Sequence, residues 1–219
     1  MDRTIQAALF DLDGVLVDTA KYHYLAWKRL AQELGFFFSK KQNERLKGVS
    51  RMRSLEILLE EGNLSGEFSQ EEMLDMASRK NAWYVEYIEN LKRSELFPGA
   101  RECLTYLRGR GIRTALGSAS KNSGLILERL EITDLFDAIV DGNMVSRAKP
   151  DPEVFERGAQ LLQVPYESCV VFEDSQAGLE AGRAAGMYTV AIGTSENLAG
   201  YDELLSGVSA YKELKILQK

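Results

Sequence analysis

The sequence predicts an α/β fold, a doubly wound parallel sheet with an all-α domain inserted after its first strand. Three observations support this prediction. Short apolar runs alternate with amphipathic segments, acidic or hydroxyl side chains follow several of these runs, and one long region has no strand pattern. Alternating strands and helices imply parallel strands joined by right-handed crossovers, with helices on both faces of the sheet.

Five apolar runs have the length and composition of buried strands, at residues 5–10, 112–118, 138–140, 169–172 and 188–193. Helical patterns separate the later runs, at 100–111 with Gly111 as a stop signal, and at 123–132, 152–164 and 175–186. Residues 206–219 are expected to form a short strand and a closing helix.

The region from about Asp18 to Arg93 has no convincing strand pattern. Its helical patterns cover residues 19–35, 51–62 and 69–91. We therefore expect an α/β domain made of residues 1–17 and 94–219, and a helical domain made of residues 18–93.

Composition narrows the function classes. A net charge of −6 disfavours nucleic acid and anionic membranes as partners. No run is long enough to span a membrane, no signal peptide is visible, and the two cysteines have no metal-ligand spacing, so we expect a cytoplasmic protein. The expected oligomeric state is a monomer. The single histidine, His23, excludes a multi-histidine zinc site and favours carboxylates and lysines as catalytic groups.

Asp11 and Asp13 come at the end of the first predicted strand, two residues apart and therefore on the same side of it. Gly14 permits an unusual backbone conformation directly after them. Open parallel sheets bind ligands at this carboxyl edge. A capped turn is one alternative; a calcium loop is another, but Val15 stands where that loop requires an oxygen ligand.

Four more polar residues lie next to predicted strands. Ser118 ends the second strand, Glu173 and Asp174 follow the fourth, and Lys149 lies in the segment before the fourth. Taken singly, Ser118 could cap a helix, Lys149 could be a solvated loop residue, and the acidic pair could cap the next helix. Together they place carboxylates, a hydroxyl and an ammonium at one edge of one sheet. Acids bind magnesium, whereas hydroxyl and ammonium groups bind a phosphoryl group in transfer.

The segments "DLDGVLVDT", "GSASKN", "AKPDP" and "FEDSQAG" resemble the four ordered motifs of the haloacid dehalogenase superfamily. The resemblance implies a Rossmann-like core fold with a helical cap, and the Asp-x-Asp form implies phosphoryl transfer. "TAKYHYLAW", "LKGVSR", "RKN" and "SASKN" further resemble a subfamily of mutases that act on sugar phosphates. In that subfamily acidic residues follow the "GVSR" segment, whereas this chain has Met52 and Arg53.

The resemblance implies that Asp11 is the nucleophile, which forms an aspartyl phosphate, and that Asp13 is the general acid and base. Mg²⁺ would be bound by Asp11, the Asp13 carbonyl, Asp174 and Glu173. Arg51 would hold the phosphate that is not in transfer; on the residues alone it is a helix-terminal charge, and His23 a structural histidine. The implied substrate and phosphate contacts are Thr19, His23, Trp27, Gly48, Val49, Ser50, Arg51, Lys80, Ser118, Ala119, Ser120, Lys121, Asn122 and Lys149.

The implied reaction is an isomerisation of small-molecule sugar phosphates. It interconverts β-D-glucose 1-phosphate and D-glucose 6-phosphate, with β-D-glucose 1,6-bisphosphate as phosphodonor and intermediate. A Mg²⁺-dependent sugar-phosphate phosphatase with the same core is the alternative enzyme. A non-catalytic sugar-phosphate sensor is disfavoured because the catalytic set is complete in the sequence.

Overall fold

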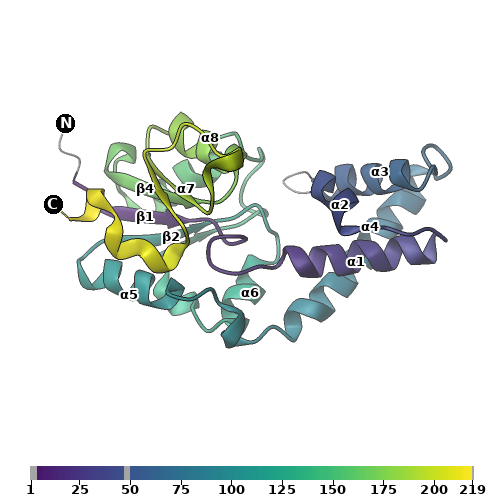
Figure 1. Ribbon diagram of the computed structural model, residues 1–219, viewed down its shortest axis with the longest axis horizontal. Coiled ribbons are helices and arrows are strands. Elements are labelled where there is room, and N and C mark those ends of the chain that lie inside the picture. Colours follow the sequence, from purple (N-terminus) through teal and green to yellow (C-terminus); the bar gives the residue numbers. More distant parts are fainter. Residues whose placement is uncertain (1–3, 47–49, 219) are drawn as a thin grey trace. The chain divides into compact units, whose positions relative to one another are not determined.

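The structure, a computed structural model, describes residues 4–46 and 50–218. The chain forms two compact units (Figure 1). The α/β unit consists of the described residues up to Asp18 and from Leu91 onward, and the helical unit of those within Thr19–Asn90. Each unit is described by itself.

The described part of the α/β unit contains a six-stranded parallel sheet in the order β3-β2-β1-β4-β5-β6. This confirms the predicted fold class. Because the strand order reverses between β1 and β4, the ends of these two strands form a topological switch point, where open sheets bind ligands. The strands are β1 (Ala7–Phe10), β2 (Arg113–Gly117), β3 (Ala138–Val140), β4 (Cys169–Glu173), β5 (Tyr188–Ile192) and β6 (Glu203–Leu205).

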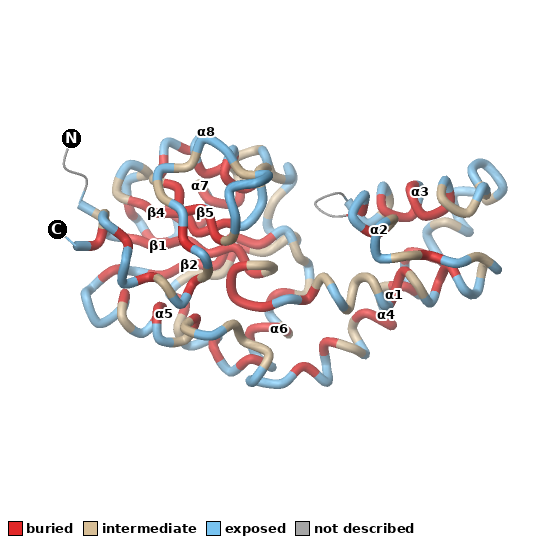
Figure 2. The backbone as a smooth tube through the Cα atoms, in the orientation of Figure 1, coloured by how far each residue is buried: buried red, intermediate tan, exposed pale blue. Residues whose placement is uncertain are grey.

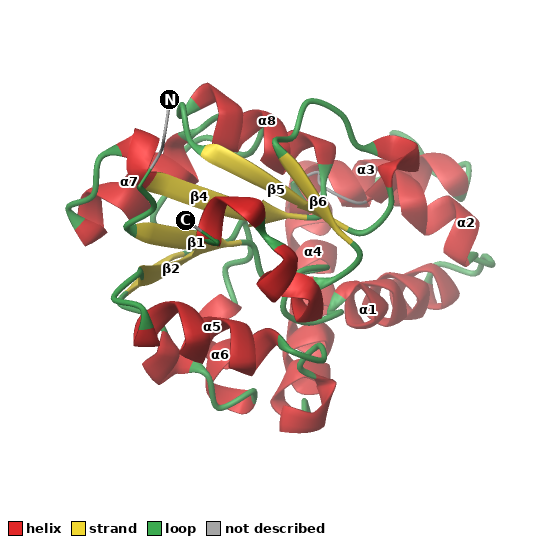
Figure 3. Ribbon diagram, turned by 60° about the vertical axis from the view of Figure 1, so that its left-hand side comes forward, coloured by secondary structure: helices red, strands yellow, loops and turns green. Residues whose placement is uncertain are grey.

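Helices cover both faces of this sheet (Figures 1 and 3). Helices α5 (Ala100–Gly109) and α6 (Ser123–Arg129) lie on one side, and α7 (Glu153–Leu162) and α8 (Gln176–Ala184) on the other. Every residue of β1 and β4 is therefore buried, which explains their continuous apolar sequences (Figure 2). The side chains of Phe10 and Phe172 stack across these two strands with ring centroids 4.4 Å apart.

The helical unit contains α1 (Ala20–Glu33), α2 (Lys40–Asn43), α3 (Arg51–Glu61) and α4 (Gln70–Glu89), and no strand in the part that the structure describes. Helices α1 and α4 pack along each other, with the Arg29 guanidinium 4.2 Å from the Trp83 ring centroid. Serine side chains cap the N-termini of α2, α3 and α4, as expected for a residue whose oxygen accepts a free backbone N–H.

The prediction that residues 206–219 form a short strand and a closing helix was wrong. Described residues 206–218 form 3₁₀ turns, and the additional strand, β6, precedes them. Periodicity missed β6 because it is a three-residue edge strand in which Leu204 is partly exposed. Its Glu203 carboxylate accepts the backbone N–H groups of Lys215 and Ile216, at 2.9 and 3.0 Å, and so ties the C-terminal segment to the sheet.

The four-residue helix α2 was also missed, because it is too short to show a helical period. None of the helices described has the length and hydropathy of a membrane-spanning segment. The described 3₁₀ helices are Glu44–Leu46, Arg93–Glu95, Thr133–Leu135, Tyr166–Ser168, Ser195–Asn197, Val208–Glu213 and Lys215–Leu217.

Candidate active site

Asp11 extends the β1 ladder by one residue, since its N–H donates to the Phe172 carbonyl at 3.0 Å. The chain then reverses in a tight loop in which the Gly14 N–H donates to the Val17 carbonyl at 2.8 Å. Gly14 has a φ of +81°, which a residue with a side chain rarely adopts. The strand end and the loop together hold Asp11 at the sheet edge, where it is 9% exposed, with Asp13 in the loop beyond it.

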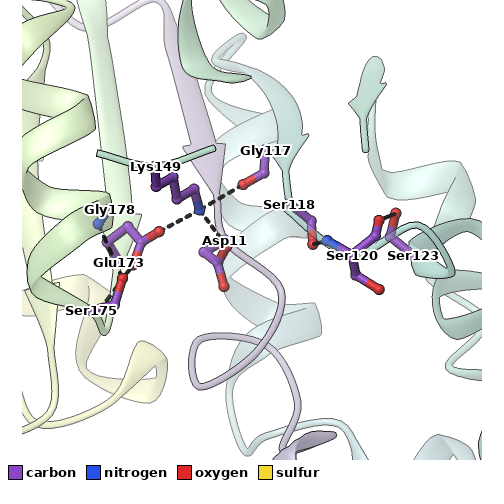
Figure 4. A network of polar contacts seen from close by, with 9 residues as sticks. All are labelled: Asp11, Gly117, Ser118, Ser120, Ser123, Lys149, Glu173, Ser175 and Gly178. Atoms are coloured by element: carbon purple, nitrogen blue, oxygen red, sulfur yellow. Dashed lines mark hydrogen bonds and ion pairs between the residues drawn. The ribbon is translucent and has the colours of Figure 1, made fainter. Parts of the chain in front are cut away.

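Lys149 connects the ends of three strands (Figure 4). Its Nζ lies 2.5 Å from an oxygen of Asp11, 2.5 Å from an oxygen of Glu173 and 3.0 Å from the Gly117 carbonyl. The three contacts match the three protons of an ammonium group. Since its side chain is 10% exposed, the alternative that Lys149 is a solvated loop residue is wrong.

Glu173 is fully buried at the end of β4. Its second oxygen accepts the Ser175 N–H at 3.0 Å and the Ser175 hydroxyl at 2.8 Å. Ser175, not the acidic pair, is the N-cap of α8, because its oxygen accepts the Gly178 N–H at 3.1 Å. Gly178 leaves room for the carboxylate, which a Cβ at that position would strike.

Asp11, Glu173 and Asp174 form an acid cluster in which one oxygen of each lies within 4.8 Å of the others. Asp174 is on the exposed side of the cluster and adjoins Gly14, where a Cβ would collide with its carboxylate. A cavity of about 510 Å³ reaches both of these residues. Its other lining residues are Phe97, Pro98, Ile192, Gly193, Thr194, Asn197, Leu198, Ser206, Gly207, Val208 and Ser209.

The acid cluster has more negative charge than Lys149 balances. Burial raises the pKa of Asp11 well above its usual value, and Glu173 and Asp174 add to this while Lys149 opposes it. Asp174 reaches solvent, yet burial, Glu173 and Asp13 together raise its pKa to about 7. Burial acts to lower the pKa of Lys149, but Asp11 and Glu173 raise it overall.

Three carboxylates that repel one another in a desolvated site are suited to bind a hard divalent cation. Mg²⁺ prefers oxygen ligands and would supply the missing positive charge. Gly14 supports this fit, since it leaves open the space in which the Asp174 carboxylate lies beside the other two acids.

Ser118 follows β2 directly and is 2% exposed. Its Oγ accepts the Ser120 N–H at 3.1 Å, and the Ser120 Oγ in turn accepts the Asn122 N–H at 3.2 Å. Because the Ser118 oxygen is the acceptor, its own hydrogen is available to a phosphoryl oxygen. Helix α6 begins at Ser123, so the alternative that Ser118 caps a helix is wrong. The other two predicted residues of this loop, Ala119 and Lys121, are exposed.

In the helical unit, the buried Lys80 contacts the half-buried His23. Lys80 is 2% exposed, and its Nζ lies 2.8 Å from His23 Nδ1 and 4.5 Å from the Trp27 ring centroid. The His23 ring stacks on Tyr84 at 3.9 Å. Burial, with a contribution from Arg51, lowers the pKa of Lys80 to about 7. Burial, then Lys80 and Arg51, lower the pKa of His23 well below its usual value, so the ring is neutral at pH 7.

Arg51 is the first residue of α3 and is exposed. Desolvation by partial burial of the Arg51 side chain lowers its pKa from the usual value. Ser50 caps this helix by accepting the Arg53 N–H at 3.2 Å. Arg53, which departs from the subfamily pattern, pairs with Glu56 at 2.7 Å and Glu60 at 3.3 Å on its own helix. The charge of Arg53 is therefore compensated locally.

Three further predicted residues belong to this unit. Thr19 is buried, and its hydroxyl accepts from the Tyr84 hydroxyl at 3.4 Å. Gly48 and Val49 lie outside the described residues.

The structure thus brings four predicted residues into one network, Asp11, Lys149, Glu173 and Asp174. It also adds Ser175, which sequence reasoning missed as a contact of the site. Its place directly before a helical pattern signals an N-cap, but nothing in the sequence signals that it also binds Glu173.

Comparison with known proteins assigns the chain to a family. Residues 5–186 match the family described as "Hydrolase: haloacid dehalogenase-like hydrolase". The chain belongs to this haloacid dehalogenase family. Beta-phosphoglucomutase from Bacillus subtilis (strain 168) is 40% identical over 198 residues, which are 90% of this chain and 88% of that protein.

Two further proteins to which this chain is similar are informative. The crystal structure of beta-phosphoglucomutase from Clostridium difficile has a TM-score of 0.89 and 39% identity, and 98% of each chain is covered. The phosphorylated carbohydrates phosphatase of Thermotoga maritima is 32% identical over 185 residues, 84% of this chain and 82% of that protein. The predicted family resemblance is therefore confirmed, and the chain is an enzyme of this family. Membership of the family implies that its activity depends on Mg²⁺.

The contact between Gly14 and Asp174 gives a first prediction. Gly14→Ala should weaken Mg²⁺ binding by about 10- to 100-fold, the range usual when the support of a metal ligand is disturbed. Gly111→Ala is the matched control, because Gly111 has a φ of +75° but faces open space. Titration calorimetry with Mg²⁺ measures both variants, and equal affinities would contradict the placement of Asp174.

The buried Lys80 gives a second prediction. Its pKa is about 7 in the folded chain against 10.5 in the unfolded chain, so between these values the unfolded chain binds more protons. The free energy of unfolding should therefore rise with pH in this range, by up to about 1.4 kcal/mol per pH unit. Lys80→Met should abolish this contribution.

Urea unfolding at about pH 7.5 and about pH 9 tests this slope. Fluorescence reports the helical unit, because both tryptophans, Trp27 and Trp83, belong to it. Lys41→Met, at an exposed lysine of α2, controls for the loss of one positive charge. Parallel pH profiles for the wild type and Lys80→Met would show that Lys80 is not held in a desolvated site.

Proposed function

We propose that the chain is a mutase that interconverts β-D-glucose 1-phosphate and D-glucose 6-phosphate through β-D-glucose 1,6-bisphosphate. Its identity to two beta-phosphoglucomutases, 40% and 39% over most of the chain, supports this proposal. The observation that carries it is that both units present groups suited to phosphate. These are Lys149 and Ser118 in the α/β unit and Arg51 at the N-terminus of α3 in the helical unit.

In the proposed reaction, one oxygen of Asp11 attacks the phosphorus atom and displaces the sugar oxygen, which gives an aspartyl phosphate. Bound Mg²⁺, held by Asp11, the Asp13 carbonyl, Asp174 and Glu173, would reduce the repulsion between the carboxylate and the phosphate. The Lys149 ammonium, already in contact with Asp11, and the Ser118 hydroxyl would donate to the phosphoryl oxygens as their charge grows.

Asp13 is the proposed general acid and base. It would give a proton to the departing sugar oxygen and take one from the hydroxyl that attacks the aspartyl phosphate. Its position in the loop after Asp11 gives the two carboxyl groups different surroundings, which suits one for attack and the other for proton transfer.

We assign residues 1–17 and 94–219 to a catalytic core domain and residues 18–93 to a cap domain that selects the substrate. Arg51 would bind the phosphate that is not in transfer, since Arg53 beside it is already paired with glutamates. Thr19, His23, Trp27, Ser50 and Lys80 would contribute to the sugar site, and Ser120, Lys121 and Asn122 to the phosphate loop. We further propose a cytoplasmic monomer that binds neither nucleic acid nor membrane, in keeping with the net charge of −6.

A sugar-phosphate phosphatase is the second candidate. It is favoured by the 32% identity to the phosphorylated carbohydrates phosphatase of Thermotoga maritima. Such an enzyme would form the same aspartyl phosphate and transfer the phosphoryl group to water. It would need no separate anion site in the helical unit.

Phosphorus NMR separates the two candidates. With β-D-glucose 1-phosphate, Mg²⁺ and a trace of β-D-glucose 1,6-bisphosphate, the proposal expects glucose 6-phosphate to accumulate. Asp11→Asn should form neither product, because the amide oxygen is a poor nucleophile. Accumulation of free phosphate without glucose 6-phosphate would establish the phosphatase instead.

The role of Arg51 gives a further prediction. Arg51→Ala removes charge-assisted hydrogen bonds worth about 1.5–3 kcal/mol each, so kcat/KM for β-D-glucose 1-phosphate should fall by about 10- to 150-fold. Phosphorylation of Asp11 by acetyl phosphate should change much less, because that donor has no second phosphate. Arg53→Ala is the matched control, since Arg53 is paired on its own helix. No loss with the sugar phosphate, or an equal loss with Arg53→Ala, would contradict the role of Arg51.

A further inference from the structure

The turn that carries Lys149 poses a structural problem. Ser146, Arg147 and Ala148 are exposed, yet the Lys149 side chain that follows them is 10% exposed and reaches Asp11. An exposed turn has little apolar packing to hold its backbone, and fixing each residue costs about 1–2 kcal/mol of conformational entropy. An interaction other than apolar packing must therefore hold the backbone at Lys149 in place.

The Glu153 carboxylate, in the first turn of α7, contacts the beginning of this turn. One oxygen accepts the Ser146 N–H at 3.1 Å, and the other accepts the Arg147 N–H at 2.8 Å. The Ser146 hydroxyl donates to both oxygens, at 3.2 and 3.0 Å, and Arg147 Nε lies 3.3 Å from the second oxygen. The carboxylate thus binds two successive backbone groups of the turn directly.

We infer that Glu153 is a positioning residue for Lys149. It joins the turn of residues 146–149 to the rigid N-terminus of α7, so that the Lys149 ammonium is held between Asp11 and Glu173. The helix that bears Glu153 packs on β1, β2 and β3, so the carboxylate is fixed to the sheet whose edge forms the site. The inference rests on the proposed function only in that Lys149 is assigned to the phosphoryl group.

The charge of Glu153 suits this role. An ionised carboxylate accepts stronger hydrogen bonds from backbone N–H groups than a neutral oxygen does. The backbone N–H groups of Ser146 and Arg147 lower the pKa of Glu153 to about 2, with the serine hydroxyl and the Arg147 side chain contributing and burial opposing. The carboxylate is therefore ionised throughout the neutral range.

Glu153 could also act only by stabilising the dipole of α7, without positioning Lys149. Any acid in the first turn of a helix stabilises it through the helix dipole. Glu156 lies in the same turn of α7, and within the described part of the chain it makes no hydrogen bond or ion pair with residues 146–149. If Glu153 acted only on the dipole, Glu153→Asp would preserve its effect, because the charge remains. A positioning role requires the longer side chain, which reaches both backbone N–H groups.

The experiment compares Glu153→Ala, Glu153→Asp and the control Glu156→Gln in the full chain. Acetylation of Lys149 by N-hydroxysuccinimidyl acetate, read by peptide mass spectrometry against the exposed Lys121, reports the position of Lys149 without any catalysis. Phosphorylation of Asp11 by acetyl phosphate reports the consequence for the proposed chemistry. Thermal unfolding checks that each variant is folded.

We expect Lys149 acetylation to rise several-fold in both Glu153 variants, and phosphorylation to slow by up to about 100-fold, as for a misplaced catalytic group. Glu156→Gln should behave as the wild type in both assays. Wild-type protection of Lys149 in Glu153→Asp, or in every Glu153 variant, would overturn the inference. If the wild type itself is not phosphorylated, the proposed function fails, while the acetylation pattern still decides the role of Glu153. If Glu153→Ala does not fold, Glu153→Asp alone decides it.

Discussion

The Lys149 ammonium lies between two carboxylates that could not otherwise be buried together. Asp11 at the end of β1 and Glu173 at the end of β4 are adjacent in the sheet, and both are almost fully shielded from water. An ionised carboxylate without a partner is costly to bury, and two side by side are more costly. Because Lys149 contacts both at 2.5 Å, the strand ends can hold a nucleophile and a second acid at the same point.

The residues around this ion pair also help to hold the carboxylates together at the strand ends. The positive φ of Gly14 turns the chain after Asp11 and leaves space for Asp174, and Gly178 leaves space for Glu173. Ser175 both caps α8 and binds the oxygen of Glu173 that Lys149 does not. The remaining negative charge, visible in the raised pKa values of Asp11 and Asp174, is what a bound Mg²⁺ would balance. The same local backbone features that shape the loops at the sheet edge therefore also place the charged groups of the site.

Much of this arrangement could be predicted from the sequence. Buried parallel strands are visible as apolar runs, and polar residues at their ends must meet at one edge, so Asp11, Ser118 and Glu173 were found without knowledge of the fold. The sequence also placed Lys149 near this edge, but its direct contacts with Asp11 and Glu173 could not be found in this way, because its side chain reaches into the site from an exposed turn. Glu153 was missed for a related reason, since an acid in the first turn of a helix is common whether or not it binds a neighbouring loop. The strand β6 was missed because three residues at a sheet edge show no apolar run.

The most direct test of this account is the stability of Lys149→Met, which keeps the bulk of the side chain and removes its charge. With a chelator present to exclude divalent ions, the free energy of unfolding at about pH 7 should fall by about 3–5 kcal/mol, as when one partner of a buried ion pair is lost. Without its cation Asp11 takes up a proton more readily in the folded chain than in the unfolded one, so the loss should shrink at about pH 5.5. A loss below about 1 kcal/mol, or one that is equal at the two pH values, would show that Lys149 is not what allows these carboxylates to be buried.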